Sequence, residues 1–209
     1  MALEFKSTDT DRIQEKKLMM KSDSMGPGTT PEEMEENLEI LMQKQVDHEF
    51  ENARLYLAMA IWCQTNGYTE TAKFFSEHAL EERKHGMDFI NAMIVLELPI
   101  RQPLTKKMKG NYDDLEELLS DAVDREIMTS IMIGKIHKCA IMQGSLASRI
   151  TEEYIEEQYE EEQLFKSILN LYKLHKNKDS LASFESQIGE IAKRTGKYMI
   201  GQLPDRLHV

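Results

Sequence analysis

Cysteine is scarce in this sequence, with only 2 among 209 residues. Cys63 and Cys139 form neither a disulfide framework nor a zinc motif, and we expect each to be a small buried side chain in a helix. No run of 18 apolar residues is present, so we expect no membrane-spanning segment. The N-terminus also lacks the apolar stretch of a signal peptide. We therefore expect a cytoplasmic, reduced protein.

Positive charge and aromatic residues are also in short supply. The formal net charge is −11, which argues against a nucleic-acid partner, because phosphate binding needs basic patches. An acidic protein attracts cations, although most of its carboxylates are expected to form an ordinary solvated surface. Aromatic residues make up 7% of the chain, there are 5 prolines, and alternating strand patterns are rare. This composition favours a mainly α-helical protein.

Helical periodicity and its stop signals divide the chain into three parts. Residues 1–30 are predicted to be a flexible N-terminal extension, residues 31–176 a helical bundle, and residues 177–209 a short helix and tail. Helices are predicted over about 31–64, about 69–96, from Asn111 or Asp113 to about 142, from 146 to about 176, and over about 181–199. A capping box at Thr30-Pro31-Glu32-Glu33 is expected to begin the first of them.

The lengths of these helices and of their connections predict the fold class. Four helices of roughly 28–35 residues, about 40–50 Å long, pack together as a four-helix bundle. Short loops make the first and second helices antiparallel neighbours, and likewise the third and fourth. The segment 98–112 is long enough to cross the length of the bundle. We therefore predict an all-α bundle with one long crossover and a short C-terminal fifth helix.

Carboxylates interrupt the apolar stripe of every long helix near its middle. Several buried carboxylates are hard to sustain without a cation, and a metal is the simplest account for four helices at once. Glu82 and His85 are spaced i, i+3, so both leave the same helix face. This pair alone also suits a solvated surface, but with the other carboxylates it matches the ligands of di-iron bundles. The interrupting residues are Glu49, Glu82, His85, Glu126, Glu157, Gln158 and Glu161.

These residues resemble those of the bacterial non-haem ferritins. The similarity covers about residues 32–175, and its most specific piece is the run Glu-Gln-Tyr-Glu-Glu-Glu-Gln-Leu-Phe-Lys at 157–166. The resemblance implies a first metal position, a second that shares Glu82 as a bridge, and a third near the second. The implied ligands are Glu49, Glu82 and His85 for the first, Glu82, Glu126, Gln158 and Glu161 for the second, and Glu81, Glu157, Glu160 and Glu161 for the third.

The resemblance also implies a function and leaves one role open. It implies an iron-storage subunit that oxidises Fe(II) with O2 or H2O2 at a di-iron centre, in a homo-oligomeric shell of 24 subunits. Tyr56 is either a hydrogen-bond donor and electron source beside this centre or an ordinary buried tyrosine. The alternatives are a di-iron or di-manganese oxidoreductase that stores nothing, and a structural bundle without metal.

Two sequence features argue against haem. Bacterioferritins carry Glu-x-x-His in both the second and the fourth helix, whereas here Glu160 stands at the corresponding fourth-helix position. Their haem-ligating methionine directly follows the bridging glutamate, and here that position is Arg83. We therefore expect iron without haem.

Rubrerythrins add a cysteine-rich iron domain, which the two cysteines of this chain do not supply.

Overall fold

The computed structural model describes residues 37–104, 106–176 and 180–195, with side chains described as far as residue 192. These segments contain helices and no strand, so the predicted all-α fold, with its long crossover and short fifth helix, is confirmed. None of these helices is both long enough and apolar enough to cross a membrane. The helices are α2 (Leu38–Thr65), α3 (Thr69–Val95), α4 (Leu115–Met142), α5 (Ala147–Lys176) and α6 (Leu181–Thr195).

Polar caps set where the helices begin. Helix α2 begins at Leu38, where the extended Asn37 caps it by accepting a hydrogen bond from the backbone N–H of Glu39. The predicted capping box and the predicted extension 1–30 lie outside the described residues. Helix α4 begins after Asp114, whose carboxylate accepts a bond from the N–H of Glu117 at 2.9 Å. Residues 196–199 of the predicted fifth helix also lie outside the described residues.

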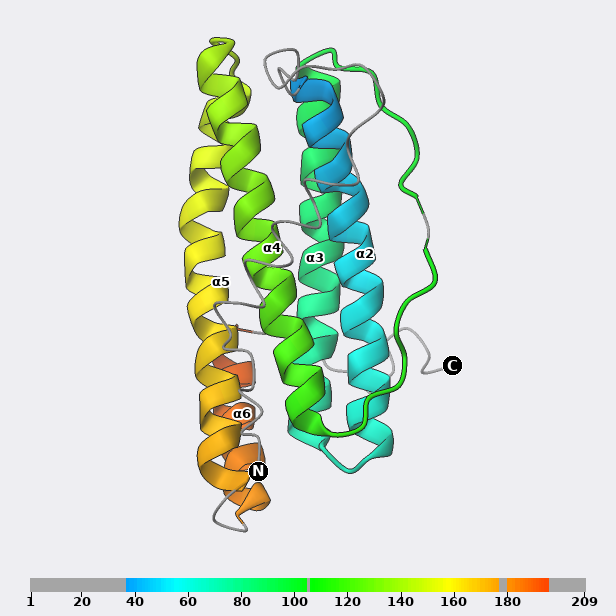
Figure 1. Ribbon diagram of the computed structural model, residues 1–209, viewed down its shortest axis with the longest axis vertical. Coiled ribbons are helices and arrows are strands. Elements are labelled where there is room, and N and C mark those ends of the chain that lie inside the picture. Colours follow the sequence, from blue (N-terminus) through cyan, green and yellow to red (C-terminus); the bar gives the residue numbers. More distant parts are fainter. Residues whose placement is uncertain (1–36, 105, 177–179, 196–209) are drawn as a thin grey trace, which may run out of the picture. The chain divides into compact units, whose positions relative to one another are not determined.

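Two glycines make the short turns that pair the helices. Gly67 has a φ of +89° after α2, and Gly144 has a φ of +62° after α4. A residue with a side chain is strained in this left-handed region, so glycine permits the tight reversal. Helices α2 and α3 therefore form one antiparallel pair, and α4 and α5 form the other, as Figure 1 shows.

The segment from α3 to α4 runs along the bundle from one end to the other (Figure 1). Asp47 of α2 holds it in place, since its carboxylate accepts from the backbone N–H of Leu104 at 2.9 Å and pairs with the guanidinium of Arg101. The backbone N–H of Arg101 also donates to Gln43. The long predicted connection is therefore an ordered crossover attached to α2.

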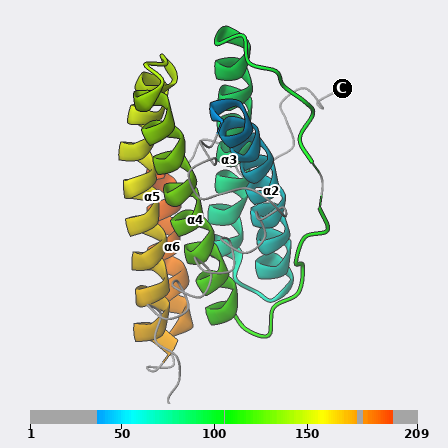
Figure 2. The same cartoon turned by 45° about the horizontal axis from the view of Figure 1, so that its top comes forward.

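Two apolar clusters fill the core, and α6 completes one of them. The aromatic cluster includes Tyr56, Phe74, Phe75, Phe165 and Phe184, and the aliphatic cluster includes Leu41, Met42, Val46, Met93 and Ile133. Helix α6 packs against α3 and α5, and its position next to α5 can be followed in Figures 1 and 2. Its buried face belongs to the aromatic cluster. Along each long helix, the two clusters are separated by a stretch that carries buried polar side chains.

Candidate metal centre

A belt of buried polar residues separates the two apolar clusters. Each of the four long helices contributes to it, with a buried carboxylate from α2, α3 and α4 and the amide of Gln158 from α5. Unpaired polar groups at such depth cost free energy, so the contacts within the belt decide what it can do. The polar belt consists of Gln45, His48, Glu49, Asn52, His78, Glu82, His85, Glu126, Thr129 and Gln158.

Glu49, Glu82 and His85 lie together in the middle of the belt. One ligand atom of each residue lies within 4.8 Å of the other two, and all three side chains are buried. Glu49 Oε2 and Glu82 Oε2 are shielded from solvent without a hydrogen-bond partner. Buried carboxylate oxygens that converge without a donor form a site suited to a hard divalent cation.

The carboxylates of this group repel one another while no cation is present. Burial raises the pKa of Glu82 well above its usual range, and the nearby carboxylates of Glu49 and Glu126 add to the rise. A divalent cation would compensate the negative charge that these carboxylates bring together.

Glu126 of α4 is held by two donors. The hydroxyl of Tyr56 donates to one of its carboxylate oxygens, and the side-chain amide of Gln158 donates to the other at 2.6 Å. Burial raises the pKa of Glu126 to about 7, although both hydrogen bonds oppose the rise. Burial and the Glu126 carboxylate also raise the pKa of Tyr56. Glu126 is therefore fixed in place, with each of its carboxylate oxygens accepting a hydrogen bond.

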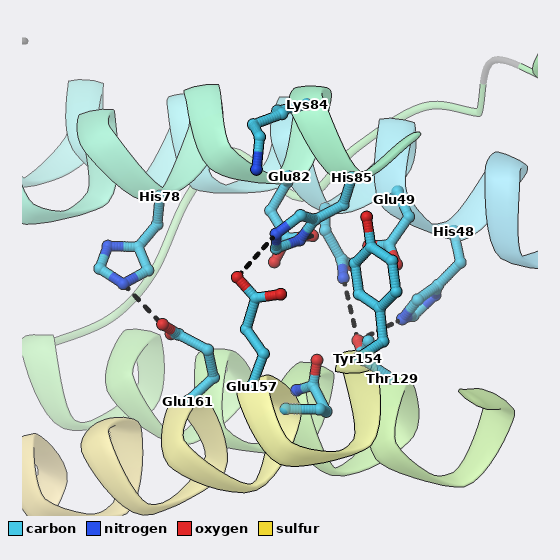
Figure 3. Close-up of polar contacts among 12 residues, drawn as sticks. His48, Glu49, His78, Glu82, Lys84, His85, Thr129, Tyr154, Glu157 and Glu161 are labelled. Carbon is cyan, nitrogen blue, oxygen red and sulfur yellow. Dashed lines mark hydrogen bonds and ion pairs between the residues drawn. The ribbon is translucent and has the colours of Figure 1, made fainter. Parts of the chain in front are cut away.

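His85 connects the buried group to a more accessible one. Its Nε2 lies 3.4 Å from Glu157 Oε1 of α5, close enough for an ion pair though without hydrogen-bond geometry (Figure 3). Burial lowers the pKa of His85, but the Glu157 and Glu49 carboxylates outweigh burial and raise it overall. The same contact lowers the pKa of Glu157. Glu81, His85 and Glu157 form a second possible ligand group, whose two carboxylates are half-buried.

His78 is a further residue of the belt, which the sequence analysis missed. It lies one helical turn before Glu82, and its Nε2 is 3.2 Å from Glu161 Oε2 (Figure 3). Although burial opposes it, the Glu161 carboxylate raises the pKa of His78 to about 9. His78, Glu81 and Glu161 form the third possible ligand group. The i−4 spacing from Glu82 was the available signal, since such residues share a helix face.

The predicted ligands therefore have different surroundings. Glu81, Glu157 and Glu161 are half-buried and belong to the possible ligand groups, whereas Glu160 is exposed and belongs to none of the three groups in the described residues. Glu126 lies outside these groups, and the side-chain amide of Gln158 donates to it. Residue spacing could not distinguish the buried, half-buried and exposed residues among the predicted ligands on α5, since each lies within one helical turn of another plausible ligand.

A second polar contact that the sequence analysis missed joins α2 to α4. His48 Nε2 lies 2.9 Å from Thr129 Oγ1, and the side-chain amide of Asn52 donates to the same hydroxyl at 3.3 Å. Burial lowers the pKa of His48 to about 3, so its ring is neutral at ordinary pH. These contacts fix α4 against α2 beside Glu49 and do not add a ligand.

Comparison with known proteins gives consistent results. A family model described as "Ferritin-like domain" matches residues 40–174. The chain is 31% identical over 147 residues to a probable bacterial non-heme ferritin-like protein of Haemophilus influenzae, covering 66% of this chain and 84% of the relative. It is 25% identical over 158 residues to a bacterial non-heme ferritin of Staphylococcus aureus, covering 75% of this chain and 95% of the relative.

Solved structures agree on the fold. An open pore ferritin from the archaeon Archaeoglobus fulgidus superposes with a TM-score of 0.69 at 18% identity, over 75% of this chain and 98% of that one. A humanized archaeal ferritin gives the same TM-score at 20% identity, over 75% of this chain and 96% of that one. At these identities the likeness concerns the fold alone.

Proposed function

This chain belongs to the ferritin-like domain family, and from that premise we propose that it is an iron-storage subunit that oxidises Fe(II) to Fe(III) in the polar belt. The observation that carries the proposal is the convergence of Glu49, Glu82 and His85, with two buried carboxylate oxygens that lack a donor. Carboxylate oxygens and one imidazole suit Fe(II), which is the substrate here.

Glu82 is the central residue of the proposed reaction. It lies beside His85, and the carboxylates of Glu49 and Glu126 are close enough to raise its pKa. We propose that this central position lets the two oxygens of Glu82 bind two iron ions at once. Two ions held about 3.5–4 Å apart can each give one electron to the same oxidant. Two electrons and two protons convert O2 to H2O2, and the same number converts H2O2 to two water molecules.

The second iron position requires Glu126 to exchange its partners. A cation there would replace at least one of the hydrogen bonds from Tyr56 and Gln158. Gln158 is neutral, so it adds no charge that would retain Fe(III), which favours release of the product. The Tyr56 hydroxyl donates a hydrogen bond to Glu126, and we propose that this contact holds Tyr56 close to the reacting ions.

The two half-buried ligand groups are the proposed route for the product. Glu81 belongs to both, and Glu157 and Glu161 lie one turn apart on α5. Because these carboxylates are partly exposed to solvent, they are expected to hold Fe(III) less tightly than the buried group. The ferric ion can then be released for deposition in a mineral. Glu160, which is exposed, is the outermost carboxylate of this proposed route.

Storage also requires a closed shell, which we propose forms from 24 copies of this chain. Such a shell of 24.3 kDa subunits has a mass of about 580 kDa. Light scattering of the purified protein measures this mass directly. A monomer or dimer that oxidised Fe(II) but retained its metals would favour the non-storage di-iron or di-manganese oxidoreductase instead.

Removing the buried ligands tests the reaction itself. We expect the double substitution Glu82→Ala with His85→Ala to lower the rate of Fe(II) oxidation at least 100-fold, because removing a residue that merely hydrogen-bonds to a metal ligand already reduces activity by about 10–100-fold. Absorbance of the ferric product measures this rate. The matched control removes one Glu and one His elsewhere, through Glu116→Ala with His175→Ala. An unchanged rate in the first variant contradicts the proposed function.

A further inference from the structure

Gln45 of α2 lies one helical turn before Glu49 and is completely buried. Its side-chain Nε2 is 2.6 Å from Glu49 Oε1. A carboxylate oxygen can only accept at that distance, so the amide nitrogen must face it. Gln45 therefore donates a charge-assisted hydrogen bond to the residue that begins the buried ligand group.

The bond leaves the two oxygens of Glu49 in different surroundings. Oε1 accepts from Gln45, whereas Oε2 is buried without a hydrogen-bond partner. Glu49 belongs to the ligand group of Glu82 and His85. We propose that Gln45 is a positioning residue that fixes Oε1 of Glu49 and thereby leaves Oε2 for the metal ion, an inference that rests on the proposed function.

Packing alone does not account for a glutamine at this position. Gln45 Oε1 is buried without a hydrogen-bond partner, and burying an amide oxygen in this way costs free energy. A methionine would fill a similar volume without that cost. The hydrogen bond to Glu49 is the recorded contact that a methionine could not replace.

Two neighbouring contacts show why this bond is specific. Glu126 has a donor at each of its two oxygens, whereas Glu49 has one oxygen without a hydrogen-bond partner. Asn52, also buried and three residues after Glu49, directs its amide to Thr129 and so joins α2 to α4. Of these two buried amides of α2, Gln45 is therefore the one that donates to the predicted ligand Glu49.

Co(II) is a suitable probe, since it binds the same ligand types and absorbs visible light according to its coordination. We expect Gln45→Met to weaken Co(II) binding at the Glu49 position about 10–100-fold, the usual effect of removing a partner of a ligand. Gln45→Asn keeps the amide but is one methylene too short for the 2.6 Å bond, so we expect weaker binding there too. It also keeps a polar side chain, in case the methionine variant fails to fold.

Gln43→Met is the matched control on the same helix. Gln43 is buried as well, but its carbonyl oxygen accepts from the backbone of Arg101 in the crossover, so Co(II) binding should be unchanged. Circular dichroism of each metal-free variant verifies that the helices have formed. The control separates the loss of a buried amide from the loss of the bond to Glu49.

A double-mutant cycle with Glu49→Ala decides whether Gln45 acts through Glu49. We expect Gln45→Met to cause no further weakening once Glu49 is removed, and the cobalt spectra of the two Glu49→Ala proteins to coincide. Equal weakening in both backgrounds, or unchanged binding in Gln45→Met alone, overturns the inference and leaves the proposed function standing. If Glu49→Ala itself leaves Co(II) binding unchanged, the proposed site is wrong as well.

Discussion

The aromatic cluster and the polar belt are built from the same helices and have opposite requirements. Phe165 and Phe75 pack ring against ring with Tyr56, at centroid distances between 5.6 and 6.2 Å. One turn away from Phe165 on α5, Glu161 pairs with a buried histidine. The cluster is stable by itself because it removes apolar surface from water. The belt is under electrostatic strain until a cation compensates its carboxylates.

The largest expected effect comes from breaking the aromatic cluster. Phe165→Ala should lower the free energy of unfolding of the metal-free protein by roughly 3–5 kcal/mol, because it leaves a cavity among the rings. Urea unfolding followed by circular dichroism measures this loss. Leu174→Ala, at a position of α5 that is 61% exposed, is the control and should change stability by about 0.5 kcal/mol or less. Equal losses at both positions contradict the comparison.

The belt should respond to a cation, whereas the cluster should not. Co(II) at 100 times its dissociation constant should stabilise the wild-type protein by about 2.7 kcal/mol, because it binds the folded state alone. The same addition should leave the Glu82→Ala, His85→Ala variant unchanged and stabilise Phe165→Ala as much as wild type. Thermal unfolding with and without a chelator measures these differences.

The stability of the metal-free belt should also depend on pH. Burial raises the folded-state pKa of Glu126 from the usual 4.5 to about 7. Its protonated form therefore stabilises the fold fully below pH 4.5, and this contribution is lost as the pH rises through 7. Relative to Glu126→Gln, wild type should lose about 1.4 kcal/mol between pH 5.5 and 6.5. Urea unfolding in the presence of a chelator measures both proteins, and a constant difference between them would contradict this pKa.

The smallest effect concerns the contact of α6 with the rest of the bundle. Tyr68 provides no side-chain cap for α3, and Glu185 of α6 accepts from the backbone N–H of Glu70 at 2.7 Å instead. Glu185→Ala should cost about 1 kcal/mol of unfolding free energy, as for the loss of a helix cap. Glu185→Gln keeps one accepting oxygen and should cost less. Identical stability of both variants to wild type would show that α6 does not cap α3.

Much of the site was predictable because its signal is local. Glu82 and His85 share a helix face by their i, i+3 spacing, and Glu49 interrupts an apolar stripe, so the sequence alone indicates that these side chains face the core. His78 was missed because a histidine on an apolar face has no fixed meaning until its neighbours are known. Its partner, Glu161, lies on another helix and far along the chain.

The sequence by itself determined the four long helices, their antiparallel pairing and the polar residues that interrupt the apolar stripe of each. Those features follow from periodicity, caps and loop length, which involve residues near one another in the chain. Only the tertiary structure decided which oxygens are free. Glu49 keeps one unpartnered oxygen while both oxygens of Glu126 are engaged, and Gln158 and Tyr56 reach Glu126 from other helices. A hydrogen bond depends on distances of a few tenths of an ångström, which helix packing sets and residue spacing does not.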